Sequence, residues 1–226
     1  MSKLIHNSNL KFLTSFQRKS HIGHELHELS EIYNDEINIS IWQRRIDDHL
    51  LKVANNIIEA NPSLQISYLI EPGEVEEILF SKLGLSNDIL NLSEDIKELV
   101  NMFCYLFDLK RVGFRLSVLD RAMCPRFHVD MVPCRLITTY QGIATEWIEH
   151  RQVDRSKLGV VSHGNTDEES GIYSKNSDIQ QLKVGHVALL KGEGWSENSG
   201  GGLVHRSPDV KNREERRLLL TLDFGD

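Results

Sequence analysis

The chain has 226 residues, of which 40% are hydrophobic and 26% are charged. This composition is typical of a globular protein with a sizeable core, and it excludes a disordered chain. The 26 basic and 33 acidic residues give a net charge of -7, which argues against a nucleic-acid-binding protein that works through a strongly basic surface. At roughly 100–200 residues per domain, the length allows one domain or one domain with an appendage.

We expect a soluble, cytoplasmic protein without a membrane partner. No apolar run reaches the roughly 18 residues that a membrane helix needs. The first residues, MSKLIHNSNLKFLTS, lack the apolar stretch and the cleavage site of a secretory signal. Three cysteines with no CxxC motif do not make a disulfide framework.

The first half of the chain is predicted to be mainly helical. Apolar residues recur at helical spacing over 40–60, 74–83 and 93–107, with Ser93 as the cap of the last helix. Between the first two helices, the sequence LQISYLI at 64–70 is typical of a short strand.

After Asp108 the apolar residues recur at every second position instead of at helical spacing. Apolar residues at 112–118 alternate with Gly, Arg and Ser, as in a half-buried strand. Further strands are predicted at 126–132, 135–140, 145–148, 186–190, 203–206 and 217–224. The polar segment 151–182 is predicted to be a long loop. Short strands with turn residues between them favour an antiparallel sandwich or barrel.

The predicted fold class is therefore α+β. Residues 1–108 form a mainly helical N-terminal region that packs on an antiparallel β domain of residues 109–226, and the two form one compact unit. Residues 1–40 carry no clear pattern.

The segment CPRFHVDMVPC at 124–134 contains the first two candidate metal ligands. Side chains at i and i+2 of a strand point the same way, so His128 and Asp130 project together. His205, at a predicted strand end in GGLVHRSP, is the best third ligand. Two histidines and one carboxylate form the facial triad of non-haem Fe(II) enzymes, although nitrogen and oxygen ligands also suit zinc, manganese or cobalt.

The last predicted strand places a cation and a hydroxyl on one face. Arg217 and Thr221 alternate with leucines that occupy the other face. A guanidinium and a hydroxyl are the pair needed to hold a carboxylate by charge-assisted hydrogen bonds. Arg216, which the alternation places on the other face of the strand, is the second candidate for this carboxylate contact.

The order of HxD, a distal histidine and an arginine about a dozen residues later resembles the 2-oxoglutarate/Fe(II) oxygenases of the prolyl-hydroxylase kind. The resemblance covers roughly 112–224 and implies a double-stranded β-helix, a jelly-roll or cupin-like fold. Carried over by position, it implies metal binding by His128, Asp130 and His205. It also implies that 2-oxoglutarate is bound by Arg217 with the help of Tyr140 and Thr221.

A second resemblance spans nearly the whole chain. The sequences CPRFHVDMVPCRLITTYQGIATEW, VALLKGEGW, HRSP and RLLLTLDFG are similar to an uncharacterised bacterial family, domain of unknown function 1826. This resemblance also implies a gene neighbourhood of zinc homeostasis and metallochaperone GTPases. The resemblance thus implies a metallochaperone or another metal-homeostasis protein as a partner.

Two functions are carried forward from the sequence. The first is a non-haem Fe(II)/2-oxoglutarate-dependent oxygenase-like protein, with 2-oxoglutarate as a small-molecule co-substrate and a substrate that the sequence does not identify. The alternative is a non-catalytic zinc-binding protein of metal homeostasis that uses the same three ligands, to which Cys124 could add a thiolate. Cys134 also flanks the HxD motif, but it precedes an alternating strand and fits a small buried side chain equally well. A cupin-like scaffold without a metal is the third reading.

Overall fold

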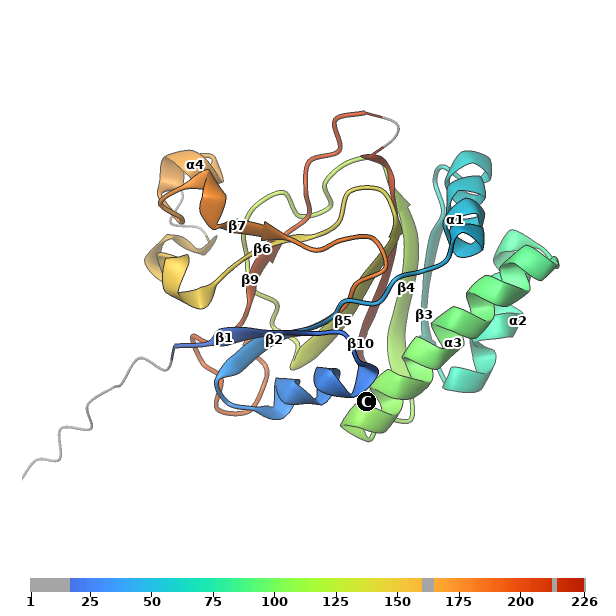
Figure 1. The fold of residues 1–226 in the computed structure, drawn as a ribbon, viewed down its shortest axis with the longest axis horizontal. Helices are drawn as coiled ribbons and strands as arrows, with labels where there is room; N and C mark the ends of the chain where they lie inside the picture. The colour runs from blue at the N-terminus through green and yellow to red at the C-terminus, as the bar shows by residue number, and fades with distance from the viewer. Residues whose placement is uncertain (1–16, 160–164, 213–214, 226) are drawn as a thin grey trace, which may run out of the picture.

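The computed structural model describes residues 17–159, 165–212 and 215–225. Its frame is a larger β-sheet with helices on one side and a smaller β-sheet on the other (Figure 1). Buried side chains fill both spaces, so the larger sheet is apolar on its two faces. This explains why its last strand, RLLLTLDF, is an almost continuous apolar run.

The larger sheet has seven strands in the order β1-β2-β8-β5-β10-β4-β3. Neighbouring strands are antiparallel, except that β1 and β2 are parallel. The bounds are β1 Lys19–Gly23, β2 Ile37–Trp42, β3 Gln65–Ile70, β4 Val112–Leu119, β5 Cys134–Gln141, β8 Val187–Lys191 and β10 Arg217–Phe224.

The smaller sheet has the order β7-β6-β9, all antiparallel. Its strands are β6 Glu146–Ile148, β7 Ile179–Gln181 and β9 Val204–Arg206. The predicted strand 126–132 is reduced to a single β-bridge, in which His128 pairs with His205 at the edge of this sheet.

The chain passes back and forth between the two sheets. It leaves β4, pairs with β9 at His128, returns to β5, crosses to β6 and β7, and then follows β8, β9 and β10. This winding is a double-stranded β-helix, and the predicted α+β fold class is confirmed.

Three helices cover the outer face of the larger sheet: α1 Asp48–Ala60, α2 Val75–Leu83 and α3 Asn87–Phe107. Ser86 caps α3 by accepting a hydrogen bond from the backbone N–H of Ile89. The predicted cap, Ser93, instead lies buried inside α3. None of the described helices is both long and apolar enough to cross a bilayer.

Short helical turns connect the larger elements. They are η1 Leu26–Tyr33, η2 Pro72–Glu74, η3 His150–Gln152, η4 Arg155–Lys157, α4 Asp167–Ser170 and η6 Asn176–Asp178. Four of these turns lie between β6 and β8, where the sequence predicted a long irregular loop.

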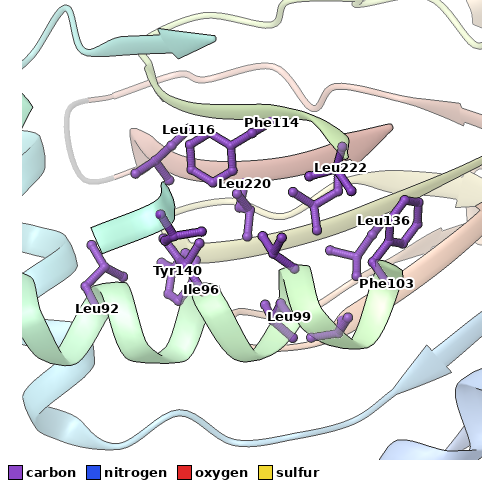
Figure 2. Close-up of a cluster of buried hydrophobic side chains, with 14 of the residues drawn as sticks. Leu92, Ile96, Leu99, Phe103, Phe114, Leu116, Leu136, Tyr140, Leu220 and Leu222 are labelled. Atoms are coloured by element: carbon purple, nitrogen blue, oxygen red, sulfur yellow. The ribbon is translucent and has the colours of Figure 1, made fainter. Parts of the chain in front are cut away.

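The main core lies between α1, α2, α3 and the larger sheet. Figure 2 shows α3 placing Leu92, Ile96, Leu99 and Phe103 against side chains from the strands. These residues recur every three or four positions, so they share one face of the helix.

The first half of the chain is less helical than predicted. β1 and β2 form one edge of the larger sheet and β3 forms the other, and all three precede residue 108. The helix predicted over 40–60 is shorter in the structure. Residues up to Trp42 belong to β2, and α1 begins at Asp48. Strands from both sides of residue 108 share one sheet and one core.

We predict a large loss of stability when the core under the helices is opened. Leu220 of β10 is fully buried between the sheet and the helices. Leu220→Ala is expected to lower the free energy of unfolding by about 2–5 kcal/mol, through lost burial and the cavity left behind. Chemical denaturation measures this.

Leu85→Ala is the matched control, because Leu85 is 81% exposed. Its effect is expected to stay within about 0.5 kcal/mol. Equal losses in the two variants would contradict the described core.

Candidate metal centre

The structure brings His128, Asp130 and His205 together. One ligand atom from each lies within 4.8 Å of the others. His205 Nε2 is 3.4 Å and His128 Nε2 is 3.8 Å from the Asp130 carboxylate, and the two imidazole rings are 4.6 Å apart. Two nitrogen donors and one oxygen donor thus converge on one point, as a facial triad requires.

Backbone pairing explains this convergence. The N–H of His128 donates to the carbonyl of His205 and the reverse bond is also made, each at 3.0 Å. Residues paired directly across antiparallel chains present their side chains on the same face.

The outer nitrogen of each imidazole is already fixed. His128 Nδ1 lies 2.9 Å from the carbonyl oxygen of Arg126, and His205 Nδ1 lies 3.2 Å from that of Leu203. A carbonyl oxygen can only accept, so each Nδ1 carries the proton and each Nε2 is free to bind a metal. Burial lowers the pKa of His205 to about 4, which keeps this imidazole neutral.

The Asp130 carboxylate is oriented by Arg135, a residue that the sequence analysis missed. Arg135 Nη1 donates to Asp130 at 2.8 Å, while its Nε and Nη2 hold Asp223 at 2.7 and 2.9 Å. Arg135 is two residues before the buried Ile137 of β5, so both side chains lie on the face of β5 that points between the sheets. That alternation was the available sequence signal.

The glycine-rich turn after β8 supports the backbone that carries Asp130. The N–H of Glu193 donates to the Asp130 carbonyl at 2.8 Å, and the N–H of Gly192 donates to the Pro133 carbonyl at 2.9 Å. A Cβ at Gly192 would lie 2.0 Å from the Val132 carbonyl oxygen, so only glycine allows this approach.

Neither cysteine near the HxD motif joins the ligand cluster of the described residues. Cys134 lies in the core under the helices, on the opposite face of β5, and burial raises the pKa of its thiol. Cys124 is exposed. The predicted thiolate ligand therefore has no counterpart in this cluster.

Arg217 begins β10 and is fully buried. Its Nη2 donates to the hydroxyl of Thr145 at 2.8 Å, whereas Nε and Nη1 have no hydrogen-bond partner within the described structure. Burial lowers the pKa of Arg217 to about 10. A buried cation with two donor nitrogens that lack a partner is costly, and an anion fits the donors that remain.

The Arg217 guanidinium and the metal ligands face the same interior. Trp147 of β6 pairs with His205 and lies in the apolar cluster between the sheets, which also contains Leu219. Thr145 is two residues before Trp147, so an extended chain places both on one face, about 7 Å apart.

Neither predicted helper hydrogen-bonds to Arg217 within the described structure. Tyr140 lies on the helix-facing side of β5, in the main core, and its hydroxyl donates to Asp95 of α3. Thr221 is half-buried and pairs with Ile137, four residues along β10. The hydroxyl that contacts Arg217 belongs to Thr145 instead.

Comparison with known families gives one match over most of the chain. The family model described as "Protein of unknown function (DUF1826)" matches residues 23–223. No curated protein matches the sequence.

Solved structures of oxygenases are similar in fold. The dioxygenase for auxin oxidation 1 from Arabidopsis thaliana, in a binary complex with 2-oxoglutarate, has a TM-score of 0.50 and 10% identity over 92% of this chain and 92% of that chain. The rice dioxygenase for auxin oxidation has a TM-score of 0.49 and 10% identity over 92% of this chain and 83% of that chain. A Pseudomonas putida prolyl-4-hydroxylase has a TM-score of 0.45 and 10% identity over 88% of this chain and 96% of that chain. At this identity, the Arabidopsis structure supports the fold alone.

The unused donors of Arg217 predict an unusual effect on stability. Without metal or 2-oxoglutarate, Arg217→Met is expected to be as stable as the wild type or more stable, because it removes a buried charge that forms no ion pair with the described residues. The free energy of unfolding in chemical denaturant, with chelator present, measures this.

Arg44→Met is the matched control. Arg44 is also buried, but it holds Asp95 through two hydrogen bonds of 2.7 and 3.1 Å. Its removal leaves Asp95 without its cation and is expected to cost about 3–5 kcal/mol. If Arg217→Met were as destabilising as Arg44→Met, Arg217 would be a structural residue.

Proposed function

The chain belongs to the DUF1826 family, and we propose that it is a non-haem Fe(II)- and 2-oxoglutarate-dependent oxygenase. One observation carries the proposal: a cluster of two histidines and one carboxylate lies on the inner side of the two β-sheets together with a buried arginine that has two donor nitrogens without a partner in the described structure. The first group fits a divalent metal and the second fits a carboxylate.

The metal would be held by His128, Asp130 and His205. The two imidazoles present Nε2, and the carboxylate supplies the negative charge. Three protein ligands on one side leave coordination positions open for small molecules. When bound there, Fe(II) would supply the oxygen chemistry that couples oxidative decarboxylation of 2-oxoglutarate to oxidation of a substrate.

The co-substrate would be held by Arg217 and Thr145. 2-Oxoglutarate has a 2-oxo acid group, which can chelate a metal, and a second carboxylate at its other end. The unused Nε and Nη1 of Arg217 can donate to that second carboxylate, as charge-assisted hydrogen bonds in a buried site. The Thr145 hydroxyl already orients the guanidinium.

Arg217 is fully buried, and the space between the two sheets that it faces is apolar. Leu219, on the same face of β10, belongs with Trp147 to the apolar cluster there. An apolar environment strengthens the attraction between the guanidinium and a bound carboxylate.

A zinc protein of metal homeostasis is the second function that the sequence suggested. The same three ligands suit zinc, but the described cluster contains no cysteine. A zinc carrier also gives no role to the unused donors of Arg217. We therefore retain zinc binding as an outcome of the experiment rather than as a parallel proposal.

The test is an anaerobic titration of the purified protein with Fe(II) and 2-oxoglutarate. We expect stoichiometric Fe(II) and a weak visible charge-transfer band when both are present, followed by succinate formation on exposure to oxygen. His128→Ala is expected to abolish metal binding and the band, because it removes one of three ligands.

Arg217→Met separates the two halves of the site. It is expected to retain Fe(II) and to weaken 2-oxoglutarate binding about 30-fold or more, the effect of removing one partner of a buried charge pair. Tight zinc binding with no response to 2-oxoglutarate would contradict the oxygenase. Unchanged co-substrate affinity in Arg217→Met would contradict the assigned clamp.

A further inference from the structure

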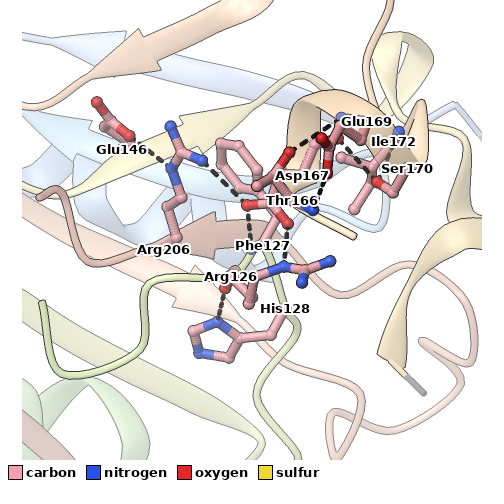
Figure 3. Close-up of polar contacts among 10 residues, drawn as sticks. All are labelled: Arg126, Phe127, His128, Glu146, Thr166, Asp167, Glu169, Ser170, Ile172 and Arg206. Atoms are coloured by element: carbon pink, nitrogen blue, oxygen red, sulfur yellow. Dashed lines mark hydrogen bonds and ion pairs between the residues drawn. The ribbon is translucent and has the colours of Figure 1, made fainter. Parts of the chain in front are cut away.

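A buried carboxylate lies behind the metal centre, on the outer face of the smaller sheet. Asp167 begins α4, in the long segment between β6 and β8. Its side chain is only 4% exposed. Figure 3 shows Asp167 pointing at the two chain segments that carry the candidate histidine ligands.

Asp167 accepts three hydrogen bonds from these segments. Its Oδ1 accepts from Arg126 Nε at 2.7 Å, and its Oδ2 accepts from the backbone N–H of Phe127 and from Arg206 Nη1, both at 3.0 Å. Two of the three donors are guanidinium groups, so these bonds are charge-assisted.

Each donor is next to a metal ligand. Arg126 and Phe127 directly precede His128, and Arg206 directly follows His205. Arg126 also accepts the His128 Nδ1–H through its carbonyl oxygen, so Asp167 holds the residue that orients this imidazole.

Further contacts fix the arginine on the β9 side. Arg206 Nε donates to Glu146 of β6 at 2.7 Å, and its guanidinium lies 4.3 Å from the centre of the Phe127 ring. Asp167 and Glu146 together balance the charges of Arg126 and Arg206. The outer network therefore joins β6, β9 and the His128 segment.

The segment that carries Asp167 is itself anchored. Thr166 and Glu169 form a reciprocal capping box at the start of α4. Ile172 is buried in a small apolar cluster with Phe127, Ile148 and Val204 of the smaller sheet. The carboxylate is thus presented from a fixed position.

We propose that Asp167 is a positioning residue of the metal centre, which sets the relative geometry of His128 and His205 from the opposite face of the sheet. This inference rests on the proposed function in one respect, namely that the triad binds a metal. It assigns a role to Asp167, in a region where the sequence predicted only a loop.

The test uses Co(II), whose visible spectrum reports ligand geometry, on the whole protein. Asp167→Asn preserves the size of the side chain and removes its charge. We expect this variant to bind Co(II) about 10-fold more weakly than the wild type, the effect of losing an outer contact to a metal ligand. We also expect a changed ligand-field spectrum at saturation.

Asp154→Asn is the matched control. Asp154 lies in the same segment, where it accepts from Ser156 and, within the described residues, makes no side-chain hydrogen bond to the histidine segments. This variant is expected to keep the affinity and the spectrum of the wild type.

Asp167→Glu keeps the result interpretable if Asp167→Asn does not fold. It retains the charge that balances Arg126 and Arg206, but it displaces the carboxylate by one methylene. We still expect a weaker affinity and a shifted spectrum in this variant.

The outcomes distinguish the two proposals. If the wild type binds no Co(II), the metal centre itself is wrong and both proposals fail. If the wild type binds Co(II) and the folded Asp167 variants match it in affinity and spectrum, only the positioning role fails, even where their thermal stability is lower.

Discussion

The backbone pair between His128 and His205 is the constraint on which the rest of this site depends. Two reciprocal hydrogen bonds of 3.0 Å fix these residues side by side at the edge of the smaller sheet. Because side chains alternate along a strand, His205 points between the two sheets and its neighbour Arg206 points to the outer face, where Asp167 binds it. Asp130, two residues after His128, completes the inner cluster. One pairing therefore organises both faces of the sheet.

Arg217 is a buried charge that costs stability and that a bound ligand would compensate. Two other largely buried arginine side chains of the described structure have a partner of opposite sign: Arg44 has Asp95, and Arg135 has Asp223. Arg217 has only the Thr145 hydroxyl within the described structure. An unpaired buried charge opposes folding, and sites that bind ligands commonly retain such a cost. A carboxylate ligand would offset it.

The sequence predicted those features that depend on local pattern. The HxD spacing identified His128 and Asp130, and the alternation along β4 and β10 identified both strands. Short edge strands such as β1 depend on pairing with distant residues, so no local pattern identified them. Tyr140 was assigned to the co-substrate site from its place in the motif order. It lies an even number of residues from the core residue Leu136 on the same strand, and this spacing indicates the helix-facing side of β5 instead. Asp167 lies in an irregular segment, so only the tertiary structure reveals its contacts.

A crystal structure of the protein with Mn(II) and 2-oxoglutarate, grown without oxygen, tests the central claim most directly. The account predicts one ion bound by Nε2 of His128, Nε2 of His205 and the Asp130 carboxylate. It also predicts 2-oxoglutarate on that ion, with its far carboxylate on Nε and Nη1 of Arg217. An ion held by other residues, or a bound co-substrate that leaves Arg217 without a carboxylate partner, would contradict it.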